Sequence, residues 1–248
     1  MIRAFKKVGD GMRFKNRSYP VEDDDLIRSF TNDPGFPYLV SFPRTGSHWL
    51  RMVMELYFEK PSLTRIFFYR KATDFTCCHS HDMELSLERR NVIYLYRDPV
   101  ATVYSQLSYC GEDIEDVGRI SHWANLYGRH LAKWLILDDF TDRKTIITYE
   151  GMKENMLMEF EKVCRHFGRM PDEERLGKAL LNVSKEALKK KTSHDRRVVN
   201  LSEGYRRRRS YFSGRYGALI WKEMNACHSG LSTLYPERQP ERRPINPA

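Results

Sequence analysis

Three short apolar runs, each followed by a polar turn and a helical pattern, constrain the fold of this chain most. They occupy residues 38–42, 91–96 and 145–149. Continuous apolar runs without alternation are typical of strands that are buried on both faces of a parallel sheet. We expect strands at 38–42, 65–69, 74–80, 91–96 and 144–149, and helices at 46–60, 99–109, 117–137 and 153–167. This alternation predicts an α/β fold with a mostly parallel sheet flanked by helices on both faces.

The length and composition favour one domain. The chain has 248 residues, of which 41% are hydrophobic, as expected for a single domain with a full core. We expect that domain to span 1–248, with a polar arm at 1–36 that is irregular or forms a short helix. The chain beyond residue 172 reads as helical and basic, and the proline-rich end at 236–248 as a disordered tail.

The formal charge of +9 is concentrated in the last quarter of the chain, in Lys189 to Lys191, Arg196, Arg197 and Arg206 to Arg209. Such a field attracts polyanions of any kind, and no nucleic-acid-binding motif accompanies it, which disfavours nucleic acid as a partner. No apolar run reaches the length of a transmembrane helix, and the N-terminus lacks the apolar core of a signal peptide. Five scattered cysteines suit a reducing compartment, so we expect a cytoplasmic location.

The segment YLVSFPRTGSHWL, residues 38–50, reads as a strand, a turn and a helix start that together form an anion cradle. Gly46 allows the backbone to approach a ligand, the helix start offers unpaired N–H groups, and Arg44 supplies positive charge. The alternative is a simple strand-to-helix turn with Trp49 in the core. The segment fails the GxxxxGK[ST] test for a nucleoside triphosphate loop, so ATP is not the expected ligand.

A second basic position follows the run at 91–96. Arg97 lies at the carboxyl end of this expected strand, Pro99 suits a first helical turn, and Ser105 lies two turns further on. In a parallel sheet, ligands bind outside the carboxyl ends of the strands, where Arg44 and Arg97 would both fall. We therefore expect Arg97 and Ser105 to close on one anionic group, the alternative for Arg97 being a solvated strand end.

Taken together, three segments resemble the sulfotransferases that use 3′-phosphoadenosine-5′-phosphosulfate (PAPS). FPRTGSHWL is similar to the 5′-phosphosulfate loop of that family, LYRDPVATVYS to its 3′-phosphate motif, and ITYEGMKEN to its YEDLKxD segment. They occur in the family's order over about residues 38–216. The resemblance implies a sulfotransferase fold related to the P-loop NTPases, PAPS as donor, PAP as product and no metal.

The resemblance also implies roles for individual residues. Arg44 would contact the sulfuryl group and the leaving phosphate, Arg97 and Ser105 would hold the 3′-phosphate, and Trp49 and Tyr149 would flank the adenine, since aromatic faces stack on any base. The candidate cofactor-binding residues that share the 5′-phosphosulfate loop are Arg44, Thr45, Gly46, Ser47, His48 and Trp49. Two departures affect this loop, because Arg44 replaces the common lysine and cannot donate a proton at neutral pH, and His48 replaces a threonine.

The catalytic base has two candidates in the sequence FTCCHSHD, residues 75–82. Ser80 and His81 match the Thr-His pair of the family, whereas His79 keeps the more usual spacing to Arg97, and we favour His81. A histidine is suited to take a proton from a hydroxyl or amine acceptor near neutral pH. A structural histidine is the alternative for each; a metal site with Cys77 and Cys78 is disfavoured because adjacent cysteines point to opposite faces of a strand.

Two later segments resemble the family less closely. Arg207, Arg208 and Arg209, in the basic run at 204–217, are candidates for an Arg-Lys-Gly-like segment on a late loop that closes the cofactor site. A solvated charge run is the alternative. Ser184 is the one residue of VSKEAL (183–188) that matches the adenine-side segment of the family.

The predicted reaction is transfer of a sulfuryl group from PAPS to a hydroxyl or amine. A small metabolite is the expected acceptor, with a lipid or glycan as alternatives, and the sequence predicts no oligomeric state. Two other functions stay open: an ATP-dependent kinase on a related fold, which would need the missing lysine, and a non-enzymatic polyanion or RNA binder, which would rest on the arginine run alone.

Overall fold

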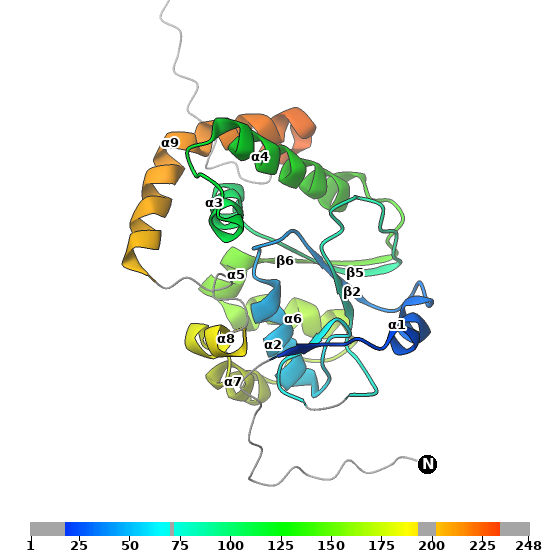
Figure 1. Ribbon diagram of the computed structural model, residues 1–248. Helices are drawn as coiled ribbons and strands as arrows, with labels where there is room; N and C mark the ends of the chain where they lie inside the picture. The colour runs from blue at the N-terminus through cyan, green and yellow to red at the C-terminus, as the bar shows by residue number, and fades with distance from the viewer. Residues whose placement is uncertain (1–17, 70–71, 193–201, 234–248) are drawn as a thin grey trace, which may run out of the picture.

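A four-stranded parallel sheet forms the centre of the molecule (Figure 1). The computed structural model describes residues 18–69, 72–192 and 202–233, so residues 1–17 of the expected N-terminal arm and the expected tail at 236–248 lie outside the described residues. The strand order is β4 (Cys78–Ser80), β2 (Tyr38–Ser41), β5 (Asn91–Tyr96) and β6 (Arg143–Thr148), and all neighbours are parallel. The α/β prediction is confirmed.

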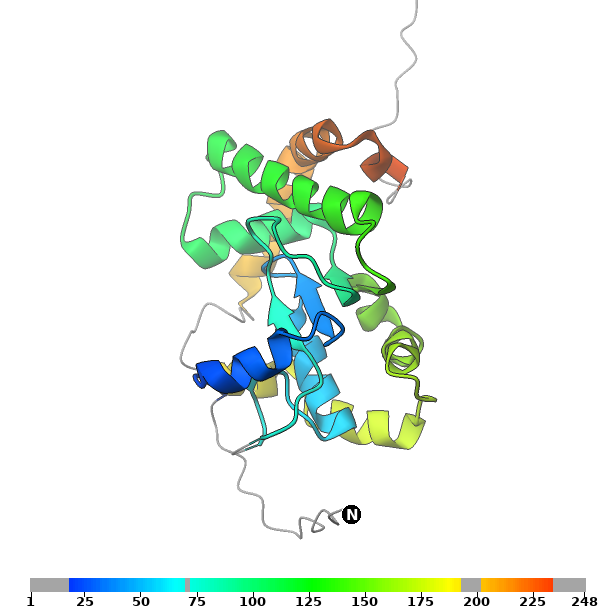
Figure 2. The same ribbon diagram turned by 90° about the vertical axis from the view of Figure 1, so that its right-hand side faces the viewer.

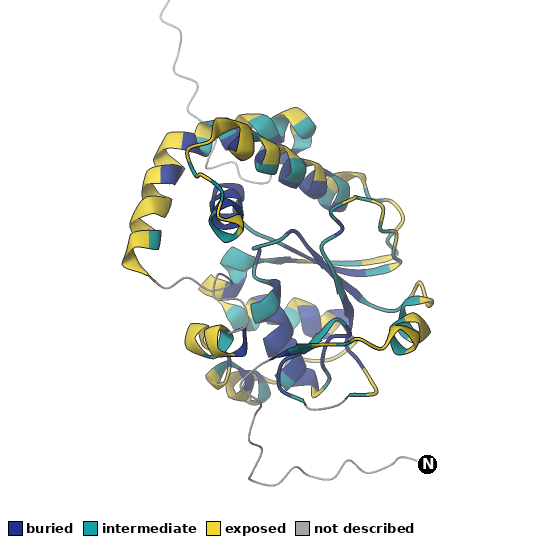
Figure 3. Cartoon of the chain, in the orientation of Figure 1, coloured by how far each residue is buried: buried dark blue, intermediate teal, exposed yellow. Residues whose placement is uncertain are grey.

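Helices cover both faces of this sheet, which explains the continuous apolar runs. On one face, Val40 and Tyr94 pack with α3 (Pro99–Cys110), α4 (Val117–Ala132) and α9 (Glu203–Cys227). On the other face, the alternate residues Leu39 and Ile93 pack with a second group of helices (Figures 1 and 2). These helices are α2 (Ser47–Phe58), α5 (Tyr149–Glu154), α6 (Met156–His166), α7 (Glu173–Leu181) and α8 (Lys185–Lys191). The two central strands, β2 and β5, are buried between the two layers, while the edge strand β6 is partly exposed (Figure 3).

Several helices begin where a side chain caps their first turn. Asp98 accepts a hydrogen bond from Ala101 N and precedes Pro99, so the predicted start of α3 is confirmed. Asp23 likewise caps α1 (Asp24–Thr31), which is the short helix of the N-terminal arm. Among the described residues, no helix is long and apolar enough to cross a bilayer.

Two of the five predicted strands are shorter than expected. β3 spans only Arg65–Ile66 and pairs antiparallel with β1 (Tyr19–Pro20) in a separate small sheet. The next backbone N–H groups, of Phe67, Phe68 and Tyr69, donate to the buried carboxylate of Glu55 instead of to a strand. The predicted strand at 65–69 was therefore wrong beyond residue 66, and that at 74–80 is reduced to β4.

Two predicted helices are interrupted. The helix expected at 117–137 is α4 up to Ala132 and continues as a π-helical turn, η1 (Lys133–Leu137). The helix expected at 153–167 is divided at Asn155, whose side chain caps α6 by accepting from Met158 N. The chain ends its described part in a short 3₁₀ turn, η2 (Ser229–Thr233).

Candidate active site

The turn between β2 and α2 brings its backbone close to Tyr149. Arg44 and Gly46 have positive φ angles of 71° and 104°. A Cβ atom on Gly46 would lie 2.6 Å from Cδ2 of Tyr149, so this position requires glycine for both conformation and space. Helix α2 begins directly afterwards with no side-chain cap, which leaves N–H groups at its start for an anion. Thr45 donates its hydroxyl to Phe42 O (2.8 Å) and is fully buried, so it offers a ligand only its backbone.

Arg97 is fixed at the carboxyl end of β5. Its Nη1 donates to Arg44 O (3.0 Å), and its guanidinium lies 4.3 Å from the ring centroid of Tyr149. The hydroxyl of Tyr127 accepts from Arg97 N (3.0 Å) and donates to Arg97 O (2.8 Å). The Nε atom of Arg97 is buried without a hydrogen-bond partner among the described residues. The carbonyl of Arg44 and the ring of Tyr149 thus fix the guanidinium of Arg97, and its Nε–H is a donor that no described residue uses.

Arg44 links the two predicted anion-binding segments. Its Nε donates to Ser105 Oγ (3.3 Å), and its guanidinium lies 4.6 Å from the ring centroid of Tyr109. Because Arg97 bonds the backbone of Arg44 while Ser105 bonds its side chain, the structure brings Arg44, Arg97 and Ser105 together.

Two histidines lie at the end of β4 with their ring centroids 4.6 Å apart. His81 Nδ1 lies 2.7 Å from Ser41 O; because a carbonyl only accepts, Nδ1 carries the proton. His79 is engaged at both nitrogens, with Nε2 3.1 Å from Ser41 Oγ and Nδ1 3.4 Å from Arg51 Nη1. Nε2 of His81 has no partner among the described residues and is the one nitrogen of the pair suited to accept a proton.

The electrostatic environment keeps the histidines of the site neutral. Burial lowers the pKa of His81, with Arg51 and Arg44 adding to the effect, and the hydrogen bond to Ser41 opposes it. Burial also lowers the pKa of His79 and of His48 well below the usual range, again with a contribution from Arg51. At neutral pH these side chains are therefore uncharged imidazoles among arginines, which is the form a general base requires.

Trp49 and Tyr149, the predicted adenine neighbours, contact each other. Their ring centroids are 6.0 Å apart with an interplanar angle of 70°, which is an edge-to-face contact. The rings thus lie side by side in one cluster, and their prediction as the two sides of an adenine site stays a prediction.

Comparisons with known proteins settle the family. The family model of the sulfotransferase domain matches residues 76–214, more than half of the chain. The chain belongs to this family. The predictions of a sulfotransferase and of PAPS as its donor are confirmed at the level of the family. A search of the curated proteins found no match.

Two solved structures are similar to this sulfotransferase. A retinol dehydratase in complex with androsterone and the inactive cofactor PAP is 11% identical, with a TM-score of 0.50 over 82% of this chain and 84% of its own. A mouse sulfotransferase, SULT7A1, complexed with PAP, is 15% identical, with a TM-score of 0.45 over 84% of this chain and 95% of its own. At these identities the first of them supports the α/β fold, and the second carries no argument.

Two of the predicted segments of this sulfotransferase belong to the helices α8 and α9. Ser184 caps α8 by accepting from Ala187 N (3.0 Å). The arginines at 207–209 lie on the first exposed turns of α9, so their expected placement on a loop was wrong (Figure 3). Arg207 is 3.8 Å from Glu203, and Arg208 Nε donates to Gly204 O (3.4 Å). Arg208 and Arg209 act electrostatically on Tyr104, the neighbour of Ser105 in α3, and their role in the cofactor site stays a prediction.

The loop after His81 is held by residues that sequence analysis missed. His130 Nε2 donates to His81 O (3.0 Å), and its Nδ1 accepts from Tyr94 Oη (2.8 Å). The buried carboxylate of Asp82 binds Lys133 Nζ (2.7 Å) and Trp134 Nε1 (3.0 Å) from η1. Nothing in the sequence marks these polar residues of α4 and η1 as supports of the loop that follows His81.

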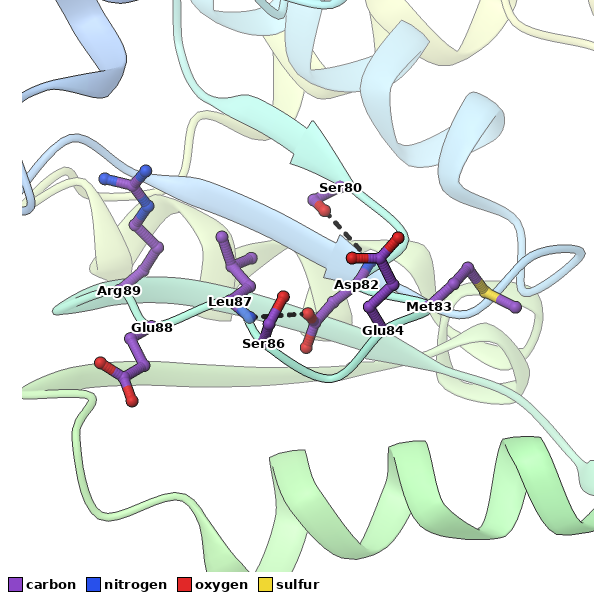
Figure 4. A pocket seen from close by; sticks show the side chains of 8 residues that line it. All are labelled: Ser80, Asp82, Met83, Glu84, Ser86, Leu87, Glu88 and Arg89. Carbon is purple, nitrogen blue, oxygen red and sulfur yellow. Dashed lines mark hydrogen bonds between the residues drawn. The ribbon is translucent and has the colours of Figure 1, made fainter.

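An open hollow of about 530 Å³ lies along the same loop (Figure 4). Asp82 is bonded within this loop, since its N–H donates to Ser80 Oγ (3.1 Å) and its Oδ1 accepts from Leu87 N (2.8 Å). The other side chains that line the hollow are Met83, Glu84, Ser86, Glu88 and Arg89. None of the described clusters of His, Cys, Asp and Glu could hold a metal ion.

Proposed function

We propose that this sulfotransferase moves the sulfuryl group of PAPS to a hydroxyl or amine of a small-molecule acceptor, with His81 as general base. The observation that carries the proposal is the hydrogen bond from His81 Nδ1 to Ser41 O (2.7 Å). It leaves Nε2 as the acceptor atom, at the carboxyl end of a parallel strand, where ligands of open α/β sheets bind. The lowered pKa of His81, caused first by burial, keeps that nitrogen unprotonated at neutral pH.

The residues present fit PAPS. The close approach of the backbone at Gly46, the uncapped start of α2 and the unpartnered Nε of Arg97 are features of an anion site. We assign the 5′-phosphosulfate to Arg44 and to the backbone of Gly46, Ser47 and His48, and the 3′-phosphate to Arg97 and Ser105. The retinol dehydratase structure described above contains PAP, which supports this assignment.

Each assigned residue has a distinct chemical task. When bound, PAPS supplies an activated sulfuryl group. His81 Nε2 takes the proton of the acceptor hydroxyl or amine, and the bond from Nδ1 to Ser41 O holds the imidazolium that results. Arg44 keeps its charge throughout and stabilises developing negative charge electrostatically. Tyr149 holds Arg97 by its ring face, so that the guanidinium meets the ligand in a fixed position.

The setting of the enzyme is part of the proposal. We place the whole chain in one domain, which the two buried clusters on either face of one sheet support. We also propose a cytoplasmic location, because all five cysteines are free and three of them are buried. A small metabolite is the acceptor we favour over a lipid or glycan.

Calorimetric titration with PAP tests the cofactor assignment. We expect PAP to bind at least about tenfold more tightly than AMP, because only PAP reaches Arg97 and Ser105 with a 3′-phosphate. Replacement Arg97→Ala should weaken PAP binding by about 1.5–3 kcal/mol, the worth of a hydrogen bond to a charged group, and leave AMP binding nearly unchanged. Equal affinity of the wild-type protein for PAP and AMP would contradict the assignment.

A further inference from the structure

Arg51 is a buried cation in α2 that the proposed reaction does not use. Its side chain is almost inaccessible to solvent, with a residue exposure of 3%. Its Nε donates to Ser62 Oγ (2.8 Å), and its Nη2 donates to Thr64 Oγ1 (3.1 Å) and to Arg65 O (3.3 Å). No carboxylate of the described residues forms an ion pair with it. A buried guanidinium is costly unless its neighbours compensate it; the Glu55 carboxylate attracts Arg51 from a distance, and the hydrogen-bond partners of Arg51 indicate what it holds in place.

The remaining arm of Arg51 is directed at His79. Nη1 of Arg51 lies 3.4 Å from Nδ1 of His79. Burial lowers the pKa of Arg51 to about 10, so it is still charged at neutral pH and can only donate. Nδ1 of His79 is therefore an acceptor, and the single proton of the neutral imidazole is on Nε2. That N–H donates to Ser41 Oγ at 3.1 Å.

Ser41 connects His79 to the proposed base. It is the last residue of β2 and is completely buried. Its hydroxyl oxygen accepts from His79, while its backbone oxygen accepts from His81 Nδ1. Ser41 is held by the pairing of β2 with β5 and by His79, and its backbone oxygen decides which nitrogen of His81 carries the proton. A hydrogen bond to one imidazole nitrogen sets the role of the other.

We propose that Arg51 and His79 are positioning residues, which hold Ser41 through a buried hydrogen-bonded chain so that His81 presents Nε2 as the base. The chain runs from Arg51 through His79 and Ser41 to His81. No proton moves along it, because each donor keeps its hydrogen while His81 accepts the proton of the acceptor. The inference rests on the proposed function of His81.

Arg51 has a second effect on His81, through its charge. The titratable or charged groups around His81 come from every neighbouring element: Arg44, His48 and Arg51 from β2–α2, His79 and Asp82 from β4 and its loop, and His130 and Lys133 from α4 and η1. Of these, the two arginines are the cations that disfavour protonation of His81. Removing the charge of Arg51 should therefore make His81 easier to protonate.

Four single variants separate the two effects. Arg51→Lys keeps the charge and Arg51→Met removes it, while His79→Gln keeps an N–H donor for Ser41 and His79→Leu removes it. We expect His79→Leu to lower kcat at least about tenfold with little change in KM for PAPS, the signature of a transition-state effect, and His79→Gln to restore part of the loss. We expect Arg51→Met, and not Arg51→Lys, to shift the acidic limb of the kcat/KM profile to higher pH.

A measurement that needs no turnover tests the chain directly. NMR of ¹⁵N-labelled imidazoles should show His81 protonated at Nδ1 in the wild-type protein and a mixture of tautomers in His79→Leu. If His81 keeps a pure Nδ1–H tautomer in His79→Leu, and kcat stays within about twofold of the wild type, the inference is wrong. If His81→Ala retains full activity, and the tautomer of His81 still shifts in His79→Leu, the base assignment fails and the structural chain stands.

A matched control tests for general loss of packing. His166 is also buried, with Nδ1 2.9 Å from Thr145 Oγ1, but it lies in α6 away from the site. His166→Leu removes a buried imidazole of the same kind and should leave kcat and the tautomer of His81 unchanged. An equal loss of kcat in His166→Leu and His79→Leu would overturn the inference, and PAP binding would verify that each variant is folded.

Discussion

His79 and His81 are separated by one residue, and their neighbours make them chemically different. Both ring nitrogens of His79 are engaged, by Arg51 and by the hydroxyl of Ser41. Within the described part of the chain, His81 is held only at Nδ1, by a backbone carbonyl. At the scale of single residues, the hydrogen-bond partners therefore favour His81 as the group that exchanges a proton.

Replacing His81 tests this assignment. We expect His81→Gln to lower kcat by about 10²–10⁴-fold, the range for loss of a general base, with little change in the affinity for PAP. Steady-state kinetics and calorimetric titration with PAP measure the two quantities. A variant with near-wild-type kcat would exclude His81 as the base.

The lowered pKa of His81 predicts how activity depends on pH. The base must be neutral to act, and burial shifts its pKa below the usual value of about 6.5. The acidic limb of kcat/KM for PAPS, which reports the free enzyme, should therefore fall at a pH below about 6.5. A limb at or above that pH, measured at constant ionic strength, would show that burial and the neighbouring arginines do not lower the pKa of His81.

At the scale of elements, Glu55 explains why an apolar segment is not a strand. Its carboxylate accepts from three consecutive backbone N–H groups, at residues 67–69, and this replaces the ladder that a strand would need. The carboxylate is completely buried, and burial raises its pKa against the effect of these hydrogen bonds. Glu55 thereby fixes the segment next to Thr64 and Arg65, which both bind Arg51.

Removing one oxygen of Glu55 should destabilise the protein. In Glu55→Gln, an NH₂ group faces backbone donors, and we expect the free energy of unfolding to fall by about 1–3 kcal/mol. Glu59→Gln is the control, because Glu59 lies at the end of the same helix with a side chain that is 74% exposed, beside Arg175. We expect the control to change stability by less than about 0.5 kcal/mol in urea unfolding. Equal effects of both variants would contradict this role of Glu55.

These elements also show how far the sequence predicts the structure. The runs at β2 and β5 were identifiable because both faces are covered, and the proximity of Arg44, Arg97 and Ser105 because they follow strands that end at one edge. The tertiary partners of polar side chains could not be read in the same way. Arg51 in a helix has the pattern of a solvent-exposed residue, and its burial depends on hydroxyls that only folding brings to it.

At the scale of the whole molecule, buried neutral histidines occur on both faces of the sheet. His130, in α4, is 1% exposed, and burial lowers its pKa to about 3. His166, in α6, is 4% exposed, and burial lowers its pKa to about 4. Both differ from a histidine of the unfolded chain, whose pKa is about 6.5. In mild acid, the unfolded chain therefore binds protons at these two histidines and the folded protein does not.

This difference predicts that the protein loses stability in mild acid. Below pH 6.5 the unfolded chain binds protons at these two histidines that the folded protein does not, so the free energy of unfolding falls as the pH decreases. Between pH 7.5 and 5 each histidine should contribute a loss of about 2 kcal/mol, which urea unfolding at several pH values would measure. The double variant His130→Gln/His166→Gln should show a pH slope smaller by about two protons near pH 5, whatever its absolute stability. Identical slopes in the variant and the wild type would mean that these imidazoles are protonated in the folded protein, in conflict with their burial.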